Sequence, residues 1–438
     1  MRPDIKYKLY VLILLFIFFP FGSNAQGIVQ MTVHPGESFY AHPGANVTVF
    51  SDLNNSGSIG SYNQSTINFL GQRWNSRLGS RMMDESLNGL TGIGGIIKFS
   101  GSTFSQTITS LNAPQPNNAF PNLLLANPLN LMLQGNDLLI RRSFNFQSGR
   151  VILNNTNVVM ELGASIGGFD NTKYFVTGTT TTGGALVRRT TGSQTTQIVF
   201  PIGTTTGSYT PASIIYTGLP QDLKLRVFEN VYVRAIFGST DNINYLNKTW
   251  NLRFSTLDPN SKIVFSTQHN SSEEGSKFTA DRTSSFISRY QLNIEKWDYV
   301  KPIGITPGVL TTGSPIANSY LNTRTINGGL GLNEYFSKSV MKENVLANYR
   351  VPVGISPNND GLNDKFVIEN LKVTDKVRIE IYNRLQSLVF RDNDYKNSFE
   401  GIGNQQGMVN NSLPDGTYYY VLHFNDSKPV TSYMIINR

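Results

Sequence analysis

The sequence contains no cysteine at any of its 438 positions. This absence excludes disulfide bonds, zinc sites built on thiolates, and cysteine nucleophiles. It also excludes a lipoprotein, because lipid attachment needs a cysteine at the cleavage point. A chain of this length without crosslinks must obtain its stability from apolar burial and strand pairing, spread over two to four domains.

Charged residues are also scarce, at 15% of the sequence against roughly 25% in an average soluble domain. The basic residues are scattered, with only doublets such as Arg141-Arg142 and Arg188-Arg189, so the clustered basic face needed for nucleic-acid binding is missing. The sequence is instead rich in Asn, Thr, Ser and Gly, which suit turns and strand edges. No stretch keeps an apolar period near 3.6 residues, whereas short alternating runs recur. We therefore expect an all-β protein.

The apolar run at residues 9–19 is too short for a membrane-spanning helix, which needs about 20 residues. Arg2, Lys6 and Lys8 precede the run, and Ser23-Asn24-Ala25 follows it. A positive segment, an apolar core and small residues at the cleavage positions predict a Sec signal peptide over residues 1–25, cut after Ala25.

Residues 26–170 predict short strands between Gly- and Asn-rich turns. Gly135, Gly149 and Gly163 stand fourteen residues apart, each just past an alternating run. A right-handed parallel β-helix and an antiparallel β-sandwich both fit this repeat, and the turn-rich residues 54–71 favour the β-helix slightly. The apolar residues that alternate here are Leu123/Leu125, Leu129/Leu131/Leu133, Leu138/Ile140, Phe144/Phe146, Val151/Leu153 and Val158/Met160/Leu162.

Residues 171–300 predict longer strands at 223–228, 232–237, 249–254, 262–267 and 288–294, which together suggest a β-sandwich. Trp250 and Trp297 are the expected core residues, because Trp buries a large apolar area. The Phe-Pro-Ile-Gly motif at residues 200–203, with the later strand that contains Trp250, loosely resembles β-rich modules of large Bacteroidetes surface proteins. Part of residues 301–350 should complete the sandwich and the rest should form a linker, with a short helix or connector at 337–349.

Catalytic residues are not predicted anywhere in the sequence. The four histidines, His34, His42, His269 and His423, are far apart, and no nucleophile elbow, zincin helix or phosphate loop occurs. His34-Pro35-Gly36 and His42-Pro43-Gly44 are interpreted as two turns rather than a metal pair, and the Gly-rich residues 92–95 as a turn. Glu273-Glu274 is interpreted as a solvated turn. The sparse acids of the N-terminal region are Glu37, Asp52, Asp84, Glu85, Asp137 and Glu161.

Residues 351–438 predict a small Ig-like β-sandwich of about seven strands. Val377, Ile379 and Ile381 alternate with polar residues, as does the run from Tyr418 to Phe424. The segment 355–366, Ile-Ser-Pro-Asn-Asn-Asp-Gly-Leu-Asn-Asp-Lys-Phe, resembles the opening of the gliding motility-associated C-terminal domain, the type B sorting domain of type IX secretion. Later segments at 381–384, 389–390, 395–397 and 413–420 match in order. The motif residues are Pro357, Asn358, Asp360, Gly361, Asn363, Asp364, Asn383, Arg384, Gly416 and Tyr418.

Two departures from the family pattern concern turns. Leu385-Gln386 stands where the family has Trp-Gly, so a turn that needs a positive φ would cost about 1 kcal/mol or rearrange. Phe399-Glu400-Gly401 replaces Trp-Asp-Gly and keeps the aromatic residue, the acid and the glycine.

The resemblance implies a route: Sec transport, folding in the periplasm, and passage through the type IX translocon with an outer-membrane partner protein. We expect a secreted or cell-surface protein that serves adhesion or gliding, as an accessory of a larger adhesin. The alternative is a polysaccharide-binding protein, or a β-helix lyase or hydrolase, which would need only two or three carboxylates or a basic residue.

A metal site is one interpretation of the motif acids. Asp360, Asn363 and Asp364, with Asn358, offer hard oxygen ligands on a turn that contains Gly361, and these could hold Ca²⁺. Asx turns that satisfy local backbone N–H groups explain the same residues. No other cofactor is expected.

Overall fold

The computed structural model describes residues 30–302, 304–308, 310, 318–341, 349–372, 374–424 and 429–438. The predicted signal peptide at residues 1–25 lies outside these ranges. Across the described residues no helix is long and apolar enough to cross a membrane. The chain forms two compact units: the first runs to Asp298 and includes Pro302–Val340, and the second comprises Tyr299–Lys301 and Met341–Arg438. The boundaries expected at 170, 300 and 350 stay predictions.

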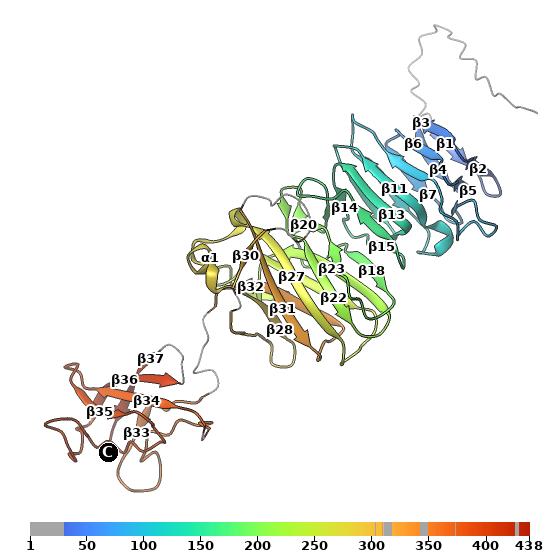
Figure 1. Cartoon of the computed structure of the whole chain (residues 1–438). Helices are drawn as coiled ribbons and strands as arrows, with labels where there is room; N and C mark the ends of the chain where they lie inside the picture. The colour runs from blue at the N-terminus through green and yellow to red at the C-terminus, as the bar shows by residue number, and fades with distance from the viewer. Residues whose placement is uncertain are drawn as a thin grey trace, which may run out of the picture. The chain divides into compact units, whose positions relative to one another are not determined.

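Parallel strands in three sheets form the first half of unit 1, and the antiparallel alternative for this region is wrong. Sheet 1 contains β1 (Gln30–Val33), β4 (Asp52–Asn55), β7 (Arg73–Ser76), β10 (Gln106–Ser110), β12 (Leu131–Gly135), β14 (Val151–Ile152), β17 (Phe175–Val176) and β20 (Ile202–Thr205), extended by the antiparallel β21 (Ser208–Tyr209). Sheet 2 begins with β3 (Asn46–Val49), β6 (Thr66–Phe69), β9 (Ile96–Phe99), β11 (Phe120–Ala126), β13 (Leu138–Ser148), β15 (Val158–Met160) and β18 (Leu186–Thr190), with β16 (Ser165–Gly167) beside β13. Sheet 3 is β2 (Ser38–Ala41), β5 (Ser58–Ser61) and β8 (Arg81–Met83). The chain thus winds as a parallel β-solenoid (Figure 1).

One coil of this solenoid has no fixed length. The register pairs Met31 with Leu53, Leu53 with Trp74, and Trp74 with Ile108, so successive coils take 22, 21 and 34 residues. Gly135, Gly149 and Gly163 all have a positive φ, between 77° and 83°. Their fourteen-residue spacing therefore marks bends that need glycine rather than the length of a coil.

The alternating apolar residues of the sequence point into the solenoid and form its core. Except for Leu129 and Leu162, which are exposed, every one of the alternating residues named above between 123 and 162 is buried. A cluster of aromatic rings crosses successive coils. Its members are Phe69, Trp74, Phe99 and Phe120, which meet in T-shaped or tilted pairs at centroid distances of 5.4 to 6.4 Å. Burial of each large side chain stabilises the coil by roughly 1.5–3 kcal/mol.

Sheet 2 continues without a break from the solenoid into an antiparallel sandwich. β18 pairs in parallel with β15 on one side and antiparallel with β23 (Gln221–Glu229) on the other. The sheet then adds β26 (Lys248–Phe254), β32 (Asn333–Ser339), β28 (Phe286–Gln291) and β29 (Lys296–Trp297). Sheet 4, which faces it, contains β19 (Ile198–Phe200), β22 (Ala212–Thr217), β27 (Lys262–Asn270), β31 (Ser319–Asn327) and β30 (Thr306–Pro307). The sandwich thereby caps the end of the solenoid (Figure 1).

The core between the two sheets contains Trp250, which is fully buried, and Phe265 against Phe336 at 4.7 Å. Trp297 is only partly buried, in a smaller cluster beside the hairpin of β24 (Tyr232–Arg234) and β25 (Phe237–Thr240). Strands β31 and β32 fall within residues 301–350 and complete the sandwich, as the sequence suggested for part of that segment.

Helical structure is limited to short pieces among the described residues. The only α-helix there is α1 (Ser276–Asp281), flanked by the 3-10 turns η2 (Ser271–Glu273) and η3 (Arg282–Ser284); η1 (Pro116–Asn118) lies in the solenoid. The helix expected at 337–349 is wrong where it can be examined, since residues 337–339 belong to β32. Residues 342–348 lie outside the described ranges.

Unit 2 is a five-stranded sheet with the order β33 (Gly354–Ile355), β37 (Val430–Ile436), β36 (Gly416–Phe424), β34 (Val377–Tyr382) and β35 (Leu388–Asp392). The described residues give five strands in place of the seven expected. Loop residues cover the other side of the core: Phe366, Tyr395, Phe399 and Leu413 are buried against the strand residues. This unit has its own core, separate from that of unit 1.

Candidate functional site

The predicted motif residues 357–364 form a loop held together by its own acids. Asp364 Oδ1 accepts hydrogen bonds from the backbone N–H groups of Asn358 and Asn359, at 3.0 and 2.8 Å. Its Oδ2 accepts from Gly361 N at 2.8 Å. Asp360 Oδ1 accepts from Leu362 N, also at 2.8 Å. Asx turns therefore account for these carboxylates, and the Ca²⁺ site at Asp360, Asn363 and Asp364 stays a prediction.

Asp364→Asn should lower the free energy of unfolding of unit 2 by about 1–2 kcal/mol, because one charged acceptor serves three N–H groups. Chemical denaturation in EDTA and in calcium measures the loss. The same loss in both buffers fits Asx turns, whereas a loss confined to calcium would identify a metal site. Asp394→Asn is the control, since that exposed carboxylate pairs only with Lys396 on the surface.

Three separate loops of unit 2 meet around Arg438. Arg438 Nη1 donates to Leu413 O at 2.7 Å and to Asp415 Oδ1 at 3.1 Å, and Nη2 donates to Gly401 O at 3.4 Å. Gly401 has φ +73°, and a Cβ there would lie 3.0 Å from Pro357 Cγ. The motif segments that begin the domain, follow β35 and precede β36 thus converge at one place. We call Pro357, Gly401, Asp415 and Arg438 the motif cluster.

The remaining motif residues hold turns. Asn383 Oδ1 accepts from Leu385 N and Ser387 N, both at 2.9 Å, and closes the β34–β35 turn. Arg384 on that turn reaches Thr417 Oγ1 in β36 at 3.4 Å, next to Gly416. Tyr418 Oη donates to Pro414 O at 2.8 Å, the contact of a tyrosine corner. Arg384 thus reaches β36 and Tyr418 the turn before it, apart from the loop at 357–364.

Gln386 occupies the turn position at which the family has glycine, and its φ is +62°. Gln386→Gly should therefore raise the stability of unit 2 by about 1 kcal/mol, because glycine adopts this conformation without a steric cost. Urea denaturation measures the change. An unchanged or lower stability would mean that the glutamine side chain compensates for the strain.

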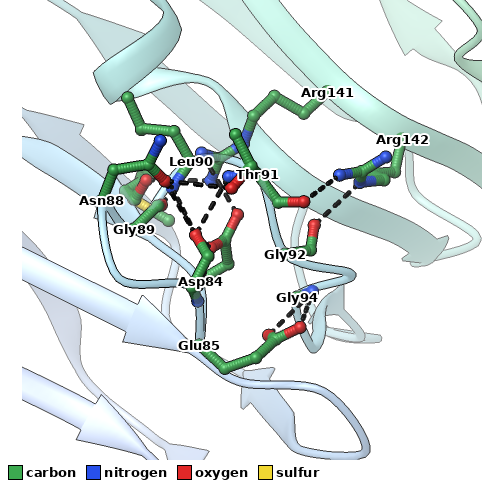
Figure 2. Close-up of polar contacts among 12 residues, drawn as sticks. Asp84, Glu85, Asn88, Gly89, Leu90, Thr91, Gly92, Gly94, Arg141 and Arg142 are labelled. Carbon is green, nitrogen blue, oxygen red and sulfur yellow. Dashed lines mark hydrogen bonds and ion pairs between the residues drawn. The ribbon is translucent and has the colours of Figure 1, made fainter.

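In unit 1, the doublet Arg141-Arg142 on β13 clamps the loop at residues 84–94 (Figure 2). Arg142 donates to Thr91 O at 2.7 Å and to Gly92 O at 2.8 Å. Arg141 donates to Met82 O and Gly89 O, at 2.9 and 3.1 Å. The doublet therefore satisfies backbone carbonyl groups of the loop, Arg141 from a largely buried position and Arg142 from an exposed one.

The two acids of this loop complete the clamp. Asp84 is buried, lies 3.5 Å from Arg141 Nη1 and accepts from Ser86 N. Glu85 accepts from Gly94 N within its own loop (Figure 2). It also accepts from Ile93 N, and from Asn63 N in the turn before β6. Because the backbone N–H groups face a carboxylate, the pKa of Glu85 is lowered even though partial burial would raise it.

The other acids of the N-terminal region also have structural partners. Glu37 accepts from His34 N, Asp52 pairs with Arg73 at 2.7 Å, and Asp137 accepts from Asn157. Glu161 pairs with Arg189 at 2.5 Å. His34 and His42 each begin a Pro-Gly turn, as expected. Over the described ranges, no group of three His, Asp or Glu side chains is placed to hold a metal ion.

The interpretation of Glu273-Glu274 as a solvated turn is wrong: the Glu273 side chain is only 11% exposed and pairs with Lys248, and Glu274 is buried more deeply. The carboxylate of Glu274 is fully buried and accepts three hydrogen bonds from Arg282, at 2.6 to 3.0 Å, and one from His269 Nε2 at 2.8 Å. His269 Nδ1 accepts from the buried Lys338 Nζ at 2.8 Å, which assigns the ring proton to Nε2. Lys338 also donates to Tyr320 O at 3.0 Å. We call Lys338, His269, Glu274 and Arg282 the buried ionic chain.

The buried ionic chain joins elements far apart in sequence: β27, the η2–α1 segment and β32. Burial and the neighbouring Lys338 ammonium lower the pKa of His269 to about 3. The pKa of Glu274 is about 2, because hydrogen bonds from His269 and Arg282 outweigh the effect of burial. The side chains of His269, Glu274 and Lys338 are inaccessible to solvent. The cluster therefore has a structural role and holds the α1 segment against the sandwich.

Residues 349–436 match the family model of the CHU_C Type IX secretion signal domain. This confirms the resemblance drawn from the motif residues. The domain implies export by type IX secretion, an interaction with the secretion machinery, and a secreted or cell-surface location. No curated protein and no solved structure matches the chain.

Proposed function

We propose that this chain is a non-catalytic protein of the outer face of the outer membrane, where it serves adhesion or gliding as an accessory of a larger adhesin. The observation that carries the proposal is that the secretion signal and the rest of the described β-structure lie in two separate units. Unit 2 holds the secretion signal domain, and unit 1 is one continuous solenoid and sandwich joined through sheet 2.

The bonding of the acidic side chains in unit 1 supports a structural role for this unit. The six acids of its N-terminal region all bond to backbone N–H groups or arginines. In the buried ionic chain, the side chains of Lys338, His269 and Glu274 are inaccessible to a substrate. A long run of parallel coils closed by a sandwich presents an extended rigid surface, which suits a spacer or a binding module.

The motif cluster of unit 2 supports the proposal that an outer-membrane protein binds this unit. Arg438 bonds to Gly401 O and to Asp415, and Pro357 packs against Gly401, so the three loops are held together as one preorganised unit. This is where we expect the secretion machinery or an associated outer-membrane protein to contact the chain.

A strain in which the gene is deleted tests the adhesion or gliding role. We expect reduced colony spreading or reduced attachment to surfaces, restored by a plasmid that encodes the full chain. Normal gliding and attachment in the deletion strain would contradict the proposal, while leaving the secretion route untouched.

A further inference from the structure

A groove of about 360 Å³ opens on the outer face of sheet 2, beside the clamped loop. Its walls are the turn at residues 63–66, the loop at 93–96, and outward-facing residues of β11 and β13 that include Asn122 and Asn145. The volume lies at the lower end of the range of ligand pockets in proteins, about 300–1,000 Å³. The groove belongs to none of the sites described above.

The lining of this groove contains no ionisable side chain. Amides and hydroxyls alternate with aliphatic groups, and Ile93 and Ile96 are 60% and 40% exposed. Asn122 is used internally, since its amide donates to the carbonyl groups of residues 93–95. Within the described part of the chain, the side-chain amides of Asn63 and Gln64 bond to no other residue. Both remain available to a ligand.

Gln64 has a strained backbone with φ +64°. The register pairs Asn46 with Thr66 and Thr66 with Ile96, so Gly44, Gln64 and Gly94 occupy the same corner in three successive coils. The φ angles of the two glycines are +78° and +69°. The corner thus requires a left-handed conformation, and glycine provides it on both sides. Gln64 therefore carries a backbone strain that the glycines of the neighbouring coils avoid, and its side-chain amide bonds to no other described residue.

The groove is also held open before any ligand arrives. Glu85 accepts from Asn63 N at 2.9 Å and from Ile93 N at 2.6 Å, so one carboxylate ties the two walls together. Arg142 fixes the same loop through Thr91 O and Gly92 O (Figure 2). Rigid walls lower the entropic cost of binding.

We propose that this groove binds a neutral glycan chain. Anionic ligands such as uronic acids or sulfated sugars would need Arg or Lys in the lining, and none is present. Sugar hydroxyls donate and accept, which matches the free amides of Asn63 and Gln64. The exposed faces of Ile93 and Ile96 suit the C–H faces of a sugar ring. The inference goes beyond the proposed function and does not depend on it.

The test uses the full chain, purified, on a microarray of neutral hexose and pentose oligosaccharides and of acidic glycans. Gln64→Gly is the decisive variant, because it should raise the melting temperature by about 1–2 °C while weakening binding about fivefold to tenfold. A loss of binding with a gain in stability cannot come from misfolding. Gln386→Gly is the matched control: it relieves the same strain in unit 2 and should leave binding unchanged.

Binding to neutral glycans that falls in Gln64→Gly and in Asn63→Ala, but not in Gln386→Gly, is the result we expect. The proposal is overturned if no neutral glycan binds, if binding is restricted to acidic glycans, or if the groove variants bind as well as the parent chain. Binding to extended peptides alone at the same groove would also overturn it.

Discussion

Glu274→Gln should lower the free energy of unfolding of unit 1 by about 3–5 kcal/mol, because it leaves a buried ionic chain without its anion. Glu274 is the acceptor for both His269 and Arg282, and its side chain has no contact with solvent. A glutamine would retain one oxygen and turn an NH₂ group toward donors. Urea denaturation followed by tryptophan fluorescence measures the loss.

The matched control for this prediction is Glu295→Gln. That carboxylate is 65% exposed and lies 3.7 Å from Arg234, so its removal should change the stability by no more than about 0.5 kcal/mol. Equal effects of the two substitutions would contradict the structural role assigned to the buried ionic chain.

The same chain makes unit 1 sensitive to acid. In the unfolded state His269 binds a proton near pH 6.5 and Glu274 near pH 4.5, whereas in the folded state their pKa values are about 3 and about 2. Acidification therefore favours the unfolded chain, and stability present above pH 6.5 is lost progressively as the pH falls toward 3. Each unit of pKa difference corresponds to about 1.4 kcal/mol. Burial also lowers the pKa of Lys338, which acts in the same direction.

Denaturation at pH 7.5, 6, 5 and 4 measures this dependence. His269→Gln should be less stable than the parent chain at pH 7.5 and should lose less stability between pH 6.5 and 5, where histidine is the group that titrates. A parent chain with constant stability over this range would show that His269 takes up its proton in the folded state as readily as in the unfolded state, against the contacts described.

Trp250→Ala should lower the free energy of unfolding of unit 1 by about 3–5 kcal/mol, the usual cost of truncating a buried Trp. Trp250 is fully buried in β26, between Val227 in β23 and Phe336 in β32, and its Nε1 donates to Thr210 O at 3.1 Å. Because β23 is bonded to β18 of the solenoid, the loss should spread into the solenoid. Scanning calorimetry should show the transition of unit 1 moved as a whole, and that of unit 2 unchanged.

Trp297→Ala provides the comparison, since Trp297 is only partly buried at the end of sheet 2. We expect a loss of about 1–2 kcal/mol. A Trp250→Ala protein in which the sandwich melts and the solenoid keeps its own transition would contradict the continuity of sheet 2.

The sequence was most informative where side-chain alternation decides which face is buried. The pairs Leu131/Leu133 and Phe144/Phe146 predicted an inward ladder, and all four are buried. Alternation predicts which face of a strand is buried but not which strand it pairs with. Alternation alone therefore could not predict the parallel pairing or the unequal coil lengths. The fourteen-residue glycine spacing had suggested a regular repeat, yet corner insertions vary from coil to coil.

The buried ionic chain could not be predicted for a related reason. His269 and Lys338 are 69 residues apart, and they meet only because β27 and β32 bring them to the α1 segment. Two consecutive glutamates in polar sequence are usually solvated, and nothing local marks Glu274 as buried. The glutamine at position 386, by contrast, signalled its strain in the sequence, through a missing glycine.

The central claim is that unit 2 directs export to the cell surface and that unit 1 is a structural unit. Surface exposure of a chain that lacks residues 349–438 tests this claim most directly. Protease shaving of intact cells, with a periplasmic marker as the control for leakage, reports where the truncated chain is. Because unit 1 has a core of its own, the truncated chain should be folded, retained in the periplasm and protected from the protease. A folded truncated chain that is digested on intact cells as readily as the full chain would contradict the account.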